Sequence, residues 1–385
     1  MHDTRGAMAE SPLDGVFITE VEEPPPGISL AVKDLFDTAG LRTTYGSVIF
    51  ADHVPTQTAE AVRRLEAAGY AIVGKTNLHE FAYGVTSQNP HYGTVPNPCA
   101  PGRVAGGSSG GSAAALAAGL ADAALGTDSG GSIRIPAACC GVVGFKPTYG
   151  VVPTQGVFPL APSFDHAGPM ARSVADCEAM MRVLAGLEPL AADPGELRVG
   201  VAWTELCEPL VRARVNAAAA LLPRTAPVEL PYPHPVGRVF MREVAEVHSG
   251  LFPEHADQYG DNVRTKLELC LQVTDGEVEA GLRAREEYRE RVEEAASGFD
   301  LLLTATLPFV APPATVEELE VRAAMIRFTF PFNVLGWPAL ALPCGDAEEG
   351  LPASVQLVGR PGDDARVLAI GRWLEAQLTT STADS

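Results

Sequence analysis

Basic charge is scarce in this sequence of 385 residues. It contains 28 Lys and Arg against 48 Asp and Glu, and the net charge at pH 7 is −20. Binding to nucleic acid or to an anionic membrane would therefore need a local basic patch, because the chain as a whole repels polyanions. We find no such patch in the sequence, so we expect neither nucleic acid nor a membrane surface as a partner.

Long apolar runs, paired cysteines and metal-binding motifs are absent as well. No apolar run approaches the roughly 18 to 20 residues that a membrane-spanning helix needs, and the N-terminal MHDTRGAMAESPLDG lacks the apolar core of a signal peptide. The seven cysteines include no C-x-x-C pair, which favours a reducing compartment. The eight histidines show no H-E-x-x-H or comparable spacing. We therefore expect a cytoplasmic protein without a metal or a cofactor.

Strand and helix patterns alternate along the chain. Residues 28–32 form a short apolar run typical of a buried strand, and residues 71–74 form another. Between them, residues 58–68 have the apolar spacing of a helix that ends at Gly69. Further strands are expected at 197–202, 301–304, 340–342 and 355–358, and further helices at 211–222, about 261–296 and 364–378. This alternation predicts an α/β fold, a sheet covered by helices, with the last residues, TTSTADS, disordered.

The segment 105–144 has the most unusual composition, with ten glycines and five serines among alanines. Such residues allow tight turns and close packing of backbones. Ser112 is placed to cap a helix over 113–118 that Gly119 ends, and 123–125 is placed to enter the sheet. The serine clusters GGSSGGS and DSGGS would then flank one short helix.

Lysine is rare, and its placement is unusual. The chain has four lysines, and three of them, Lys33, Lys75 and Lys146, lie in apolar or glycine-flanked stretches. Burial lowers the pKa of a lysine because its ammonium group is poorly solvated, so a buried lysine can act as a base near neutral pH. A serine hydroxyl needs such a base to become a nucleophile, and paired glycines expose backbone N–H groups that can hold an oxyanion. From the residues alone, catalysis, anion binding and ordinary turn formation all stay open for the serine clusters, as does simple pairing with a carboxylate for each lysine.

Two other motifs compete for the same serines. GGSSGG lacks the Lys and Ser/Thr ending of a phosphate-binding P-loop, and no G-x-G-x-x-G follows a strand, which disfavours nucleotide binding. Residues 106–110 satisfy G-x-S-x-G, which would make Ser108 the nucleophile of an α/β-hydrolase with a later Asp and His. The later histidines His234, His248 and His255 have no sequence context that indicates a triad.

Around these residues the chain resembles the amidase signature family over most of its length. The similar stretches are AVKDLFDTAG, VGKTNLHEFAYG, GGSSGGSAAALAAG, GTDSGGSIRIPAACCGVVGFKPTYG, SFDHAGPMARSVAD, FNVLGWPALALPCG and LPASVQLVG. The resemblance implies one domain over 1–385, with a signature core at 28–187, a variable region at 190–300 that shapes the substrate pocket, and the rest of the core at 299–378. It also implies the family's fold, a mixed, mainly parallel β-sheet between layers of α-helices.

The family's catalytic lysine, serine and serine correspond to Lys33, Ser108 and Ser132. Ser108 is preferred to the adjacent Ser109 because it stands 24 residues before Ser132, the separation that the family pattern implies; Ser109 is the fallback. The peptide bond before this serine is cis in the family, so the resemblance predicts a cis bond between Gly107 and Ser108. Neutral Lys33 would accept a proton from Ser108, which would accept one from Ser132 as its oxygen attacks the amide carbonyl.

The glycine-rich turn before the nucleophile would complete the site. The resemblance places the oxyanion of the tetrahedral intermediate against the backbone N–H groups around Ser129, Gly130 and Gly131. Thr127 and Arg134 are expected to support the site, and direct contact between Arg134 and the substrate stays open as an alternative.

The resemblance implies an amidohydrolase that cleaves the C–N bond of a small carboxamide through an acyl-serine, releasing a carboxylic acid and ammonia or an amine. The alternatives are a glutaminase-type subunit of an amidotransferase, an allophanate-type hydrolase of carbamates or urea-like compounds, and a silent binding protein. The family is compatible with a homodimer. The aromatic candidates for an apolar acyl pocket are Phe81, Tyr83, Phe332 and Trp337.

One position argues against the amidotransferase alternative. In the glutamine amidotransferase subunits that the chain resembles, an acidic residue before a T-x-P-x-N stretch holds the amino group of glutamine. Here Ile326 occupies that place, ahead of the stretch that begins at Thr329. Together with the net charge of −20, this disfavours a tRNA-linked amidotransferase.

Overall fold

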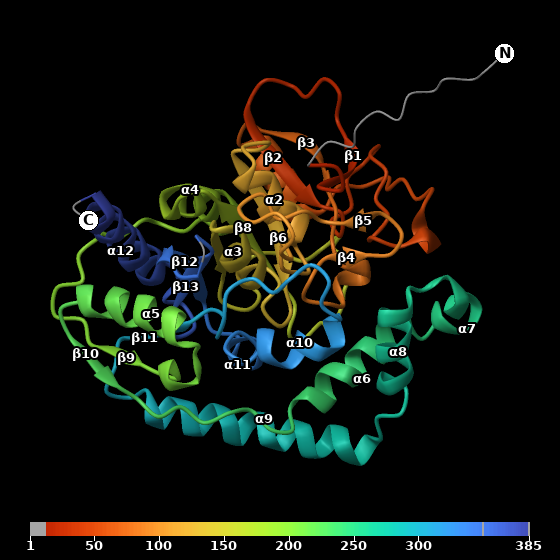
Figure 1. The fold of residues 1–385 in the computed structure, drawn as a ribbon. Helices are drawn as coiled ribbons and strands as arrows, with labels where there is room; N and C mark the ends of the chain where they lie inside the picture. The colour runs from red at the N-terminus through yellow and green to blue at the C-terminus, as the bar shows by residue number, and fades with distance from the viewer. Residues whose placement is uncertain (1–12, 349, 384–385) are drawn as a thin grey trace.

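Within residues 13–348 and 350–383, which the computed structural model describes, a central β-sheet of 11 strands runs through the protein (Figure 1). From one edge to the other, its strands are β1 (Phe17–Glu20), β3 (Tyr70–Thr76), β2 (Ile28–Lys33), β6 (Ala123–Asp128), β8 (His166–Ala171), β7 (Val143–Lys146), β12 (Ala339–Asp346), β13 (Pro352–Val358), β11 (Leu301–Ala305), β9 (Val199–Val201) and β10 (Thr225–Pro227). A separate ribbon pairs β4 (Gln88–Asn89) with β5 (Gly93–Thr94). The segments 28–187, 190–300 and 299–378 therefore all contribute strands to one sheet.

Parallel pairing occurs in two blocks of the sheet. β2 lies between β3 and β6 and is parallel to both, and β9 lies between β11 and β10 and is parallel to both. The strands that join the two blocks pair antiparallel with their neighbours, as β1 does with β3 at one edge. The expected mixed sheet is confirmed, and β2, which carries Lys33, lies inside the sheet rather than at an edge.

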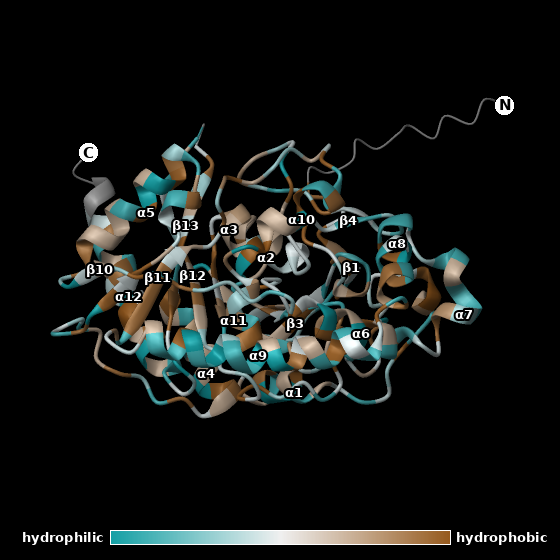
Figure 2. Cartoon of the chain, turned by 90° about the horizontal axis from the view of Figure 1, so that it is seen from below, coloured by the Kyte–Doolittle hydropathy of each residue, from teal (hydrophilic) through white to brown (hydrophobic). Residues whose placement is uncertain are grey.

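Helices cover both faces of this sheet, as predicted. One face packs against α1 (Glu60–Ala67), α4 (Val174–Ala185), α12 (Asp364–Ala383) and α5 (Pro209–Leu221), and the other against α2 (Gly110–Ala117) and α3 (Arg134–Cys140). Figure 2 shows α1 and α4 on the opposite side of the strands from α2 and α3, with β11 in the brown of hydrophobic residues. The side chains of β2 alternate accordingly, because Leu30 and Val32 join the core that contains Val62 of α1, whereas Ala31 joins a core of small residues around α2.

Close backbone approach explains why the segment around α2 is built from glycine, serine and alanine. A Cβ on Gly111 would lie 2.4 Å from the carbonyl oxygen of Asn77 and 2.6 Å from that of Val16. A Cβ on Gly110 would lie 2.4 Å from the hydroxyl oxygen of Ser87. Larger residues at these positions would force the start of α2 away from the sheet, and with it the serines that precede the helix.

A further layer of helices lies outside the sheet and its covering helices. It comprises α6 (Gly237–His248), α7 (Phe252–His255), α8 (Asp261–Cys270) and α9 (Asp275–Ala295), with α10 (Glu318–Met325) and α11 (Phe330–Leu335) between it and the sheet. Short 3₁₀ turns are η1 (Val48–Phe50), η2 (Glu80–Ala82), η3 (Thr204–Leu206) and η4 (Ala256–Gln258). In Figure 1, α9 runs along the lower side of the molecule and α6 lies beside it. α6 packs against both α8 and α9.

Two helix predictions need correction. α2 begins at Gly110, so Ser112 lies inside the helix, where its hydroxyl bonds the carbonyl oxygen of Leu125 at 3.0 Å instead of capping the N-terminus. The single helix expected over 261–296 is two helices, α8 and α9, because Thr274 starts a new one with a capping box that includes Glu277. The T-x-x-E pattern at that point is the sequence signal that the prediction overlooked.

The C-terminal tail also differs from its prediction. α12 continues to Ala383, so the expected disorder is wrong for residues 379–383. Asp384 and Ser385 lie outside the described residues, as do residues 1–12, which bear on the signal-peptide prediction.

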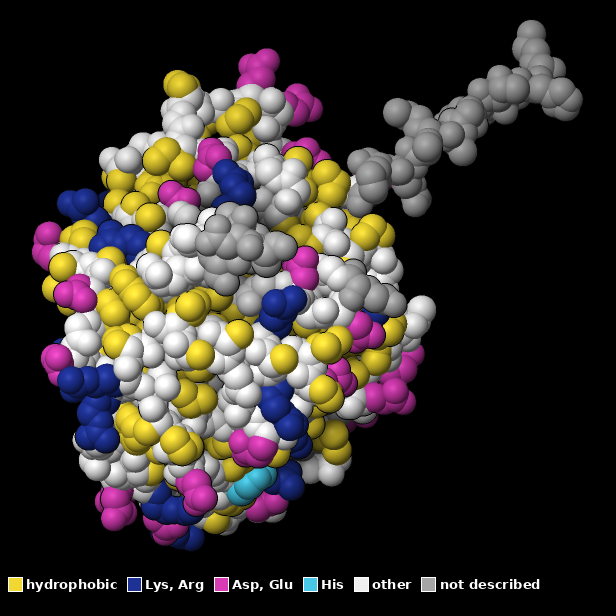
Figure 3. Space-filling view, turned by 60° about the vertical axis from the view of Figure 1, so that its left-hand side comes forward, with side chains coloured by type: hydrophobic (Ala, Val, Ile, Leu, Met, Phe, Trp, Pro, Cys, Tyr) yellow, Lys and Arg dark blue, Asp and Glu magenta, His cyan; other side chains and the backbone are white. Residues whose placement is uncertain are grey.

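Charged side chains of both signs are mixed on the surface of the protein. On the face in Figure 3, basic and acidic side chains are interspersed. Among the described residues, no helix is long and apolar enough to cross a membrane. The same residues include no group of three or more His, Cys, Asp or Glu arranged to hold a metal ion.

Candidate active site

Lys33 stands at the end of β2, surrounded by hydroxyl groups. Its Nζ lies 2.7 Å from Ser108 Oγ, 2.9 Å from Ser109 Oγ and 2.7 Å from Thr127 Oγ1. Lys33 is fully buried, and the peptide bond between Gly107 and Ser108 is cis, as expected. Three of the residues singled out from the sequence therefore meet around one buried amine.

The hydrogen bonds of Ser109 indicate which serine can give its proton to this amine. Ser109 Oγ donates to the carbonyl oxygen of Thr127 at 3.2 Å and accepts the Thr127 N–H at 3.3 Å. Its proton is thus already directed at the backbone, so towards Lys33 it can only accept. A neutral amine has two N–H donors and one lone pair, and one N–H goes to Ser109. Ser108 and Thr127 are left to share the second N–H and the lone pair, which favours Ser108 over Ser109 as the serine that passes a proton to Lys33.

Burial makes Lys33 suitable as a base. Loss of hydration lowers the pKa of Lys33 to about 7, although the negative charges of Asp128 and Asp165 act in the opposite direction. An amine with this pKa is neutral in a large fraction of molecules at physiological pH, whereas an exposed lysine is almost wholly charged.

Ser132 lies in the tight turn between β6 and α3, and Asp128 shapes that turn. The carboxylate of Asp128 accepts the backbone N–H of Gly131 at 2.8 Å and that of Ile133 at 3.2 Å. The Gly131 amide is therefore already occupied, which corrects the expectation that it donates to an oxyanion. The backbone N–H groups of Ser129 and Gly130, by contrast, have no acceptor among the described residues. A Cβ on Gly131, which has φ +132°, would lie 2.3 Å from Thr329 Oγ1, so only glycine fits there.

Arg134 holds Asp128 in place from inside the core. Its Nε and Nη2 donate to the two oxygens of Asp128 at 3.0 and 2.8 Å. Its three remaining donors reach Gln356 at 2.6 Å, Asn333 at 2.6 Å and the carbonyl oxygen of Thr329 at 3.0 Å. Burial alone would oppose ionisation of Asp128, but Arg134 and Lys146 overcome it and hold the pKa of that carboxyl well below its usual range. Arg134 is fully buried and does not line the cavity beside Ser132, so its contacts favour the supporting role over direct contact with the substrate.

Replacing Arg134 by methionine should therefore destabilise the fold. The change leaves the buried Asp128 charge unpaired, and we expect a loss of about 3–5 kcal/mol in the free energy of unfolding. Denaturant unfolding followed by circular dichroism measures it. The matched control is Arg289→Met, because Arg289 forms an exposed ion pair with Glu286 on the surface of α9 and should change stability by less than about 1 kcal/mol. Equal effects of the two changes would contradict this role.

A cavity of about 230 Å³ opens beside Ser132. The turn residues Ser129 and Gly130 form part of its wall, and the remainder comes from distant segments. The other lining residues are Ala82, Tyr83, Gly84, Val85, Leu160, Gly237, Phe240, Met241, Arg322, Ile326 and Phe330. This wall is mostly apolar, and α6 of the outer layer closes one side of it.

The aromatic residues expected to line an acyl pocket are only partly in this wall. Tyr83 lines the cavity, whereas Phe81, Phe332 and Trp337 are buried in the hydrophobic core. Sequence reasoning missed Phe240, which α6 supplies from the variable region. Nothing in the local sequence of α6 distinguishes a cavity-facing aromatic residue from one that packs against a neighbouring helix.

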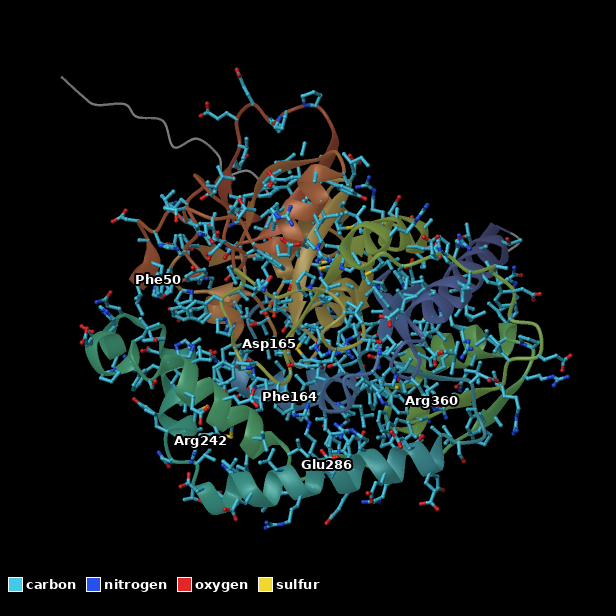
Figure 4. All side chains as sticks on the ribbon, turned by 180° about the vertical axis from the view of Figure 1, so that it is seen from behind. Phe50, Phe164, Asp165, Arg242, Glu286 and Arg360 are labelled. Carbon is cyan, nitrogen blue, oxygen red and sulfur yellow. The ribbon has the colours of Figure 1, made fainter. Side chains whose placement is uncertain are left out.

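Asp165 is a second residue that the sequence reasoning missed. It lies in the stretch SFDHAGP and accepts a hydrogen bond from Ser129 Oγ at 2.5 Å and from the Leu160 N–H at 2.9 Å. Burial raises the pKa of Asp165, while the bond from Ser129 opposes this. Figure 4 places Asp165 near the middle of the molecule, beside Phe164. Asp165 thus fixes the side chain of Ser129, which lines the cavity.

The histidine-based alternative has no geometric support. Within the described part of the chain, no histidine ring hydrogen-bonds Ser108 or Ser132. His248 bonds the Tyr259 hydroxyl at 2.9 Å and His255 bonds Gln258. The basic side chain that does hydrogen-bond Ser108 in the described part of the chain is Lys33.

Known proteins resemble this chain over most of its length. The family model described as Amidase matches residues 14–368. A Glutamyl-tRNA(Gln) amidotransferase subunit of Anaeromyxobacter dehalogenans (strain 2CP-C) is 37% identical over 407 residues, covering 91% of this chain and 82% of that protein. A crystal structure of an amidase is 40% identical with a TM-score of 0.83 over 91% of this chain and 84% of that one. The structure of 6-aminohexanoate cyclic dimer hydrolase complexed with substrate is 27% identical with a TM-score of 0.84 over 95% of this chain and 90% of that one.

Proposed function

The chain belongs to the amidase signature family, and we propose that it hydrolyses the C–N bond of a small carboxamide through an acyl-serine on Ser132. The observation that carries the proposal is the buried amine of Lys33, which has a pKa of about 7 and lies 2.7 Å from Ser108 Oγ. Ser132 lies at the wall of the adjacent cavity, where a substrate carbonyl can reach it.

The proposed reaction proceeds by proton transfer along Ser132, Ser108 and Lys33. As Ser132 Oγ attacks the carbonyl carbon, its proton passes to Ser108, and the Ser108 proton passes to neutral Lys33. The backbone N–H groups of Ser129 and Gly130 stabilise the oxyanion, each donor being worth roughly 3 kcal/mol in hydrolases where this has been measured.

The second half of the reaction returns these protons. Protonated Lys33 gives a proton back through Ser108 to the leaving nitrogen, and the C–N bond breaks to release ammonia or an amine. Water then attacks the acyl ester on Ser132 with the same groups as base, and the carboxylic acid leaves as Ser132 Oγ regains its proton.

A glutaminase-type subunit is a second candidate, favoured by the name of the curated relative from Anaeromyxobacter dehalogenans. Ile326 argues against it, because this apolar residue lies in the wall of the cavity where a glutamine amino group would need an acidic partner. A hydrolase of carbamates or urea-like compounds would use the same serine chemistry. Cytoplasmic localisation and a homodimeric assembly stay predictions.

Ammonia release by the purified chain from a panel of amides tests the proposal. The panel contains aliphatic amides, aryl amides, a peptide C-terminal amide, glutamine, a carbamate and a urea-like amide, each tested without a partner protein. Turnover of any simple amide by the single chain supports a stand-alone amidohydrolase. Turnover of glutamine only after a second protein chain is added would favour the amidotransferase candidate, and no turnover together with an unreactive Ser132 would overturn the proposal.

The pH dependence of hydrolysis should reflect Lys33. Only neutral Lys33 can accept a proton, so with a pKa of about 7 kcat/KM should fall about tenfold for each pH unit below 7 and level off above about pH 8. Initial rates between pH 5 and 9 on a neutral amide, which does not itself titrate, measure this profile. A profile that is flat across this range would contradict Lys33 as the base.

A further inference from the structure

A second buried ionic cluster lies at the cavity, away from Lys33. Glu318 of α10 accepts hydrogen bonds from Lys266 of α8 at 3.3 Å and from Arg322 Nη1 at 3.1 Å. The ring of Tyr83 lies against both cations, 4.7 Å from Lys266 Nζ and 4.9 Å from the Arg322 guanidinium carbon. One carboxylate thus faces two basic side chains, which the reaction on Ser132 does not use.

Glu318 has no capacity left for a further donor. Besides the two cations, it accepts the N–H of Val85 at 3.2 Å and the side-chain amide of Asn262 at 3.0 Å. A carboxylate offers about four acceptor positions, and all four are filled. Glu318 therefore supplies one negative charge to two basic side chains, and the cluster as a whole is positive whenever Lys266 is protonated. His79, which bonds Asn262 at 3.0 Å, adds no negative charge.

Arg322 is the cation that is free to bind something else. Of its donors only Nη1 bonds an acceptor, while Nε and Nη2 have none among the described residues. Its side chain is 23% exposed, and it lines the same cavity as Ser132. Arginine stays protonated at any physiological pH, whereas burial lowers the pKa of Lys266 to about 7. A permanent positive charge with unused donors therefore faces the substrate space.

The other residues of the cavity strengthen a hydrogen bond from Arg322 to a bound anion, and the size of the cavity restricts what can bind. Phe240, Met241, Ile326 and Phe330 are apolar and offer no competing polar side chain, so a charge-assisted hydrogen bond to Arg322 is stronger beside them than in bulk water. At about 230 Å³ the cavity is below the roughly 300 Å³ at which pockets for drug-sized ligands begin. A short acyl group fits, and an ammonium group would face Arg322, because the residues that line the cavity include no acidic side chain.

We propose that the substrate is a short amide whose acyl part carries a carboxylate, held by Arg322 while Ser132 attacks the amide carbonyl. This inference rests on the proposed amidohydrolase function and names its substrate class. Glu318 and Tyr83 are positioning residues, because they orient the guanidinium and Tyr83 also covers it within the cavity.

The wild-type chain tests this inference without any substitution. Glutaramate carries a carboxylate, pentanamide replaces that carboxylate by a methyl group, and glutamine adds an amino group to glutaramate. We expect kcat/KM to be at least about tenfold higher for glutaramate than for pentanamide. If the shorter acyl chain is preferred, the same difference should separate succinamate from butanamide. Glutamine should be hydrolysed more slowly than glutaramate. A preference for the neutral amides would overturn the inference while leaving the amidohydrolase proposal intact.

Substitution of Arg322 tests whether this residue causes the preference for a substrate with a carboxylate. Arg322→Met should reduce the ratio of kcat/KM for glutaramate to that for pentanamide at least about tenfold, and Arg322→Lys should restore part of it. The matched control Arg283→Met removes an exposed arginine of α9 and should leave the ratio unchanged. An unchanged ratio in Arg322→Met would overturn the inference.

Direct binding provides a readout that is independent of turnover. Glutarate, the acid product of glutaramate, should bind the wild-type chain in calorimetry and bind Arg322→Met at least about tenfold more weakly. If no amide is turned over, the proposed function fails, whereas loss of glutarate binding only in Arg322→Met would still support the anion site. If glutarate does not bind the wild-type chain at millimolar concentration, the inference fails.

Discussion

Replacing Ser132 by alanine should lower kcat by at least about 10⁴-fold on every amide that the wild type hydrolyses. The change removes the oxygen on which we propose that the acyl ester forms, while the turn, the cavity and the Lys33 amine remain. Little else should change, because Ser132 Oγ makes no hydrogen bond within the described residues and its loss leaves no buried group unpaired. Ammonia release and the midpoint of thermal unfolding are the two measurements.

The control for this substitution is a serine outside the site. Ser249→Ala removes a hydroxyl that bonds the carbonyl oxygen of Glu246 on the surface, so its kcat should stay within about twofold of the wild type. A Ser132→Ala enzyme that retains more than a tenth of wild-type kcat at normal stability would show that another residue is the nucleophile.

Replacing Lys33 by methionine should abolish activity without unfolding the protein. Methionine has a similar length but no amine, so the proton of Ser108 has no acceptor and kcat should fall about 10³- to 10⁴-fold. Within the described residues Lys33 hydrogen-bonds hydroxyl groups and forms no ion pair, so its loss breaks no salt bridge. The cost of burying an ammonium also disappears.

Lys75 provides the contrast for this prediction, because it is as deeply buried as Lys33 but serves a different purpose. Its Nζ forms an ion pair with Asp34 at 3.2 Å and also bonds Thr43. Lys75→Met should therefore lower the free energy of unfolding by about 3–5 kcal/mol through the unpaired Asp34 charge. If Lys33→Met is as destabilised as Lys75→Met, loss of its activity would not identify Lys33 as the base.

Elements of the fold that depend on the spacing and size of neighbouring residues can be predicted from the sequence. The short strand ahead of Lys33, the helix that ends before Gly69 and the glycine-rich segment that brings α2 close to the sheet all follow from residue spacing and size. The resemblance to the amidase signature family then indicates Ser108 and Ser132, and the position of Ser108 beside Lys33 Nζ, together with Ser109 and Thr127, is compatible with the first of these.

What the sequence could not show depends on contacts between distant segments. Asp165 contacts Ser129 across 36 positions of the chain, and Arg134 contacts Gln356 across 222. In the sequence, Arg322 is one of several charged residues on a short helix. Its position at the wall of the cavity depends on how that helix packs in the fold. The occupied amide of Gly131 likewise depends on the rotamer of Asp128, which Arg134 fixes from the core.

Identification of the acylated residue tests the central claim most directly. The chain is treated with a fluorophosphonate that modifies activated serines and is then digested with trypsin. Because neither Lys nor Arg occurs between Arg103 and Arg134, one peptide carries Ser108, Ser109 and Ser132, and fragmentation in the mass spectrometer assigns the adduct. We predict the adduct on Ser132 alone, and none on this peptide in Lys33→Met. An adduct on Ser108 or Ser109, or equal labelling of Lys33→Met, would contradict a mechanism in which Lys33 activates Ser132 through Ser108.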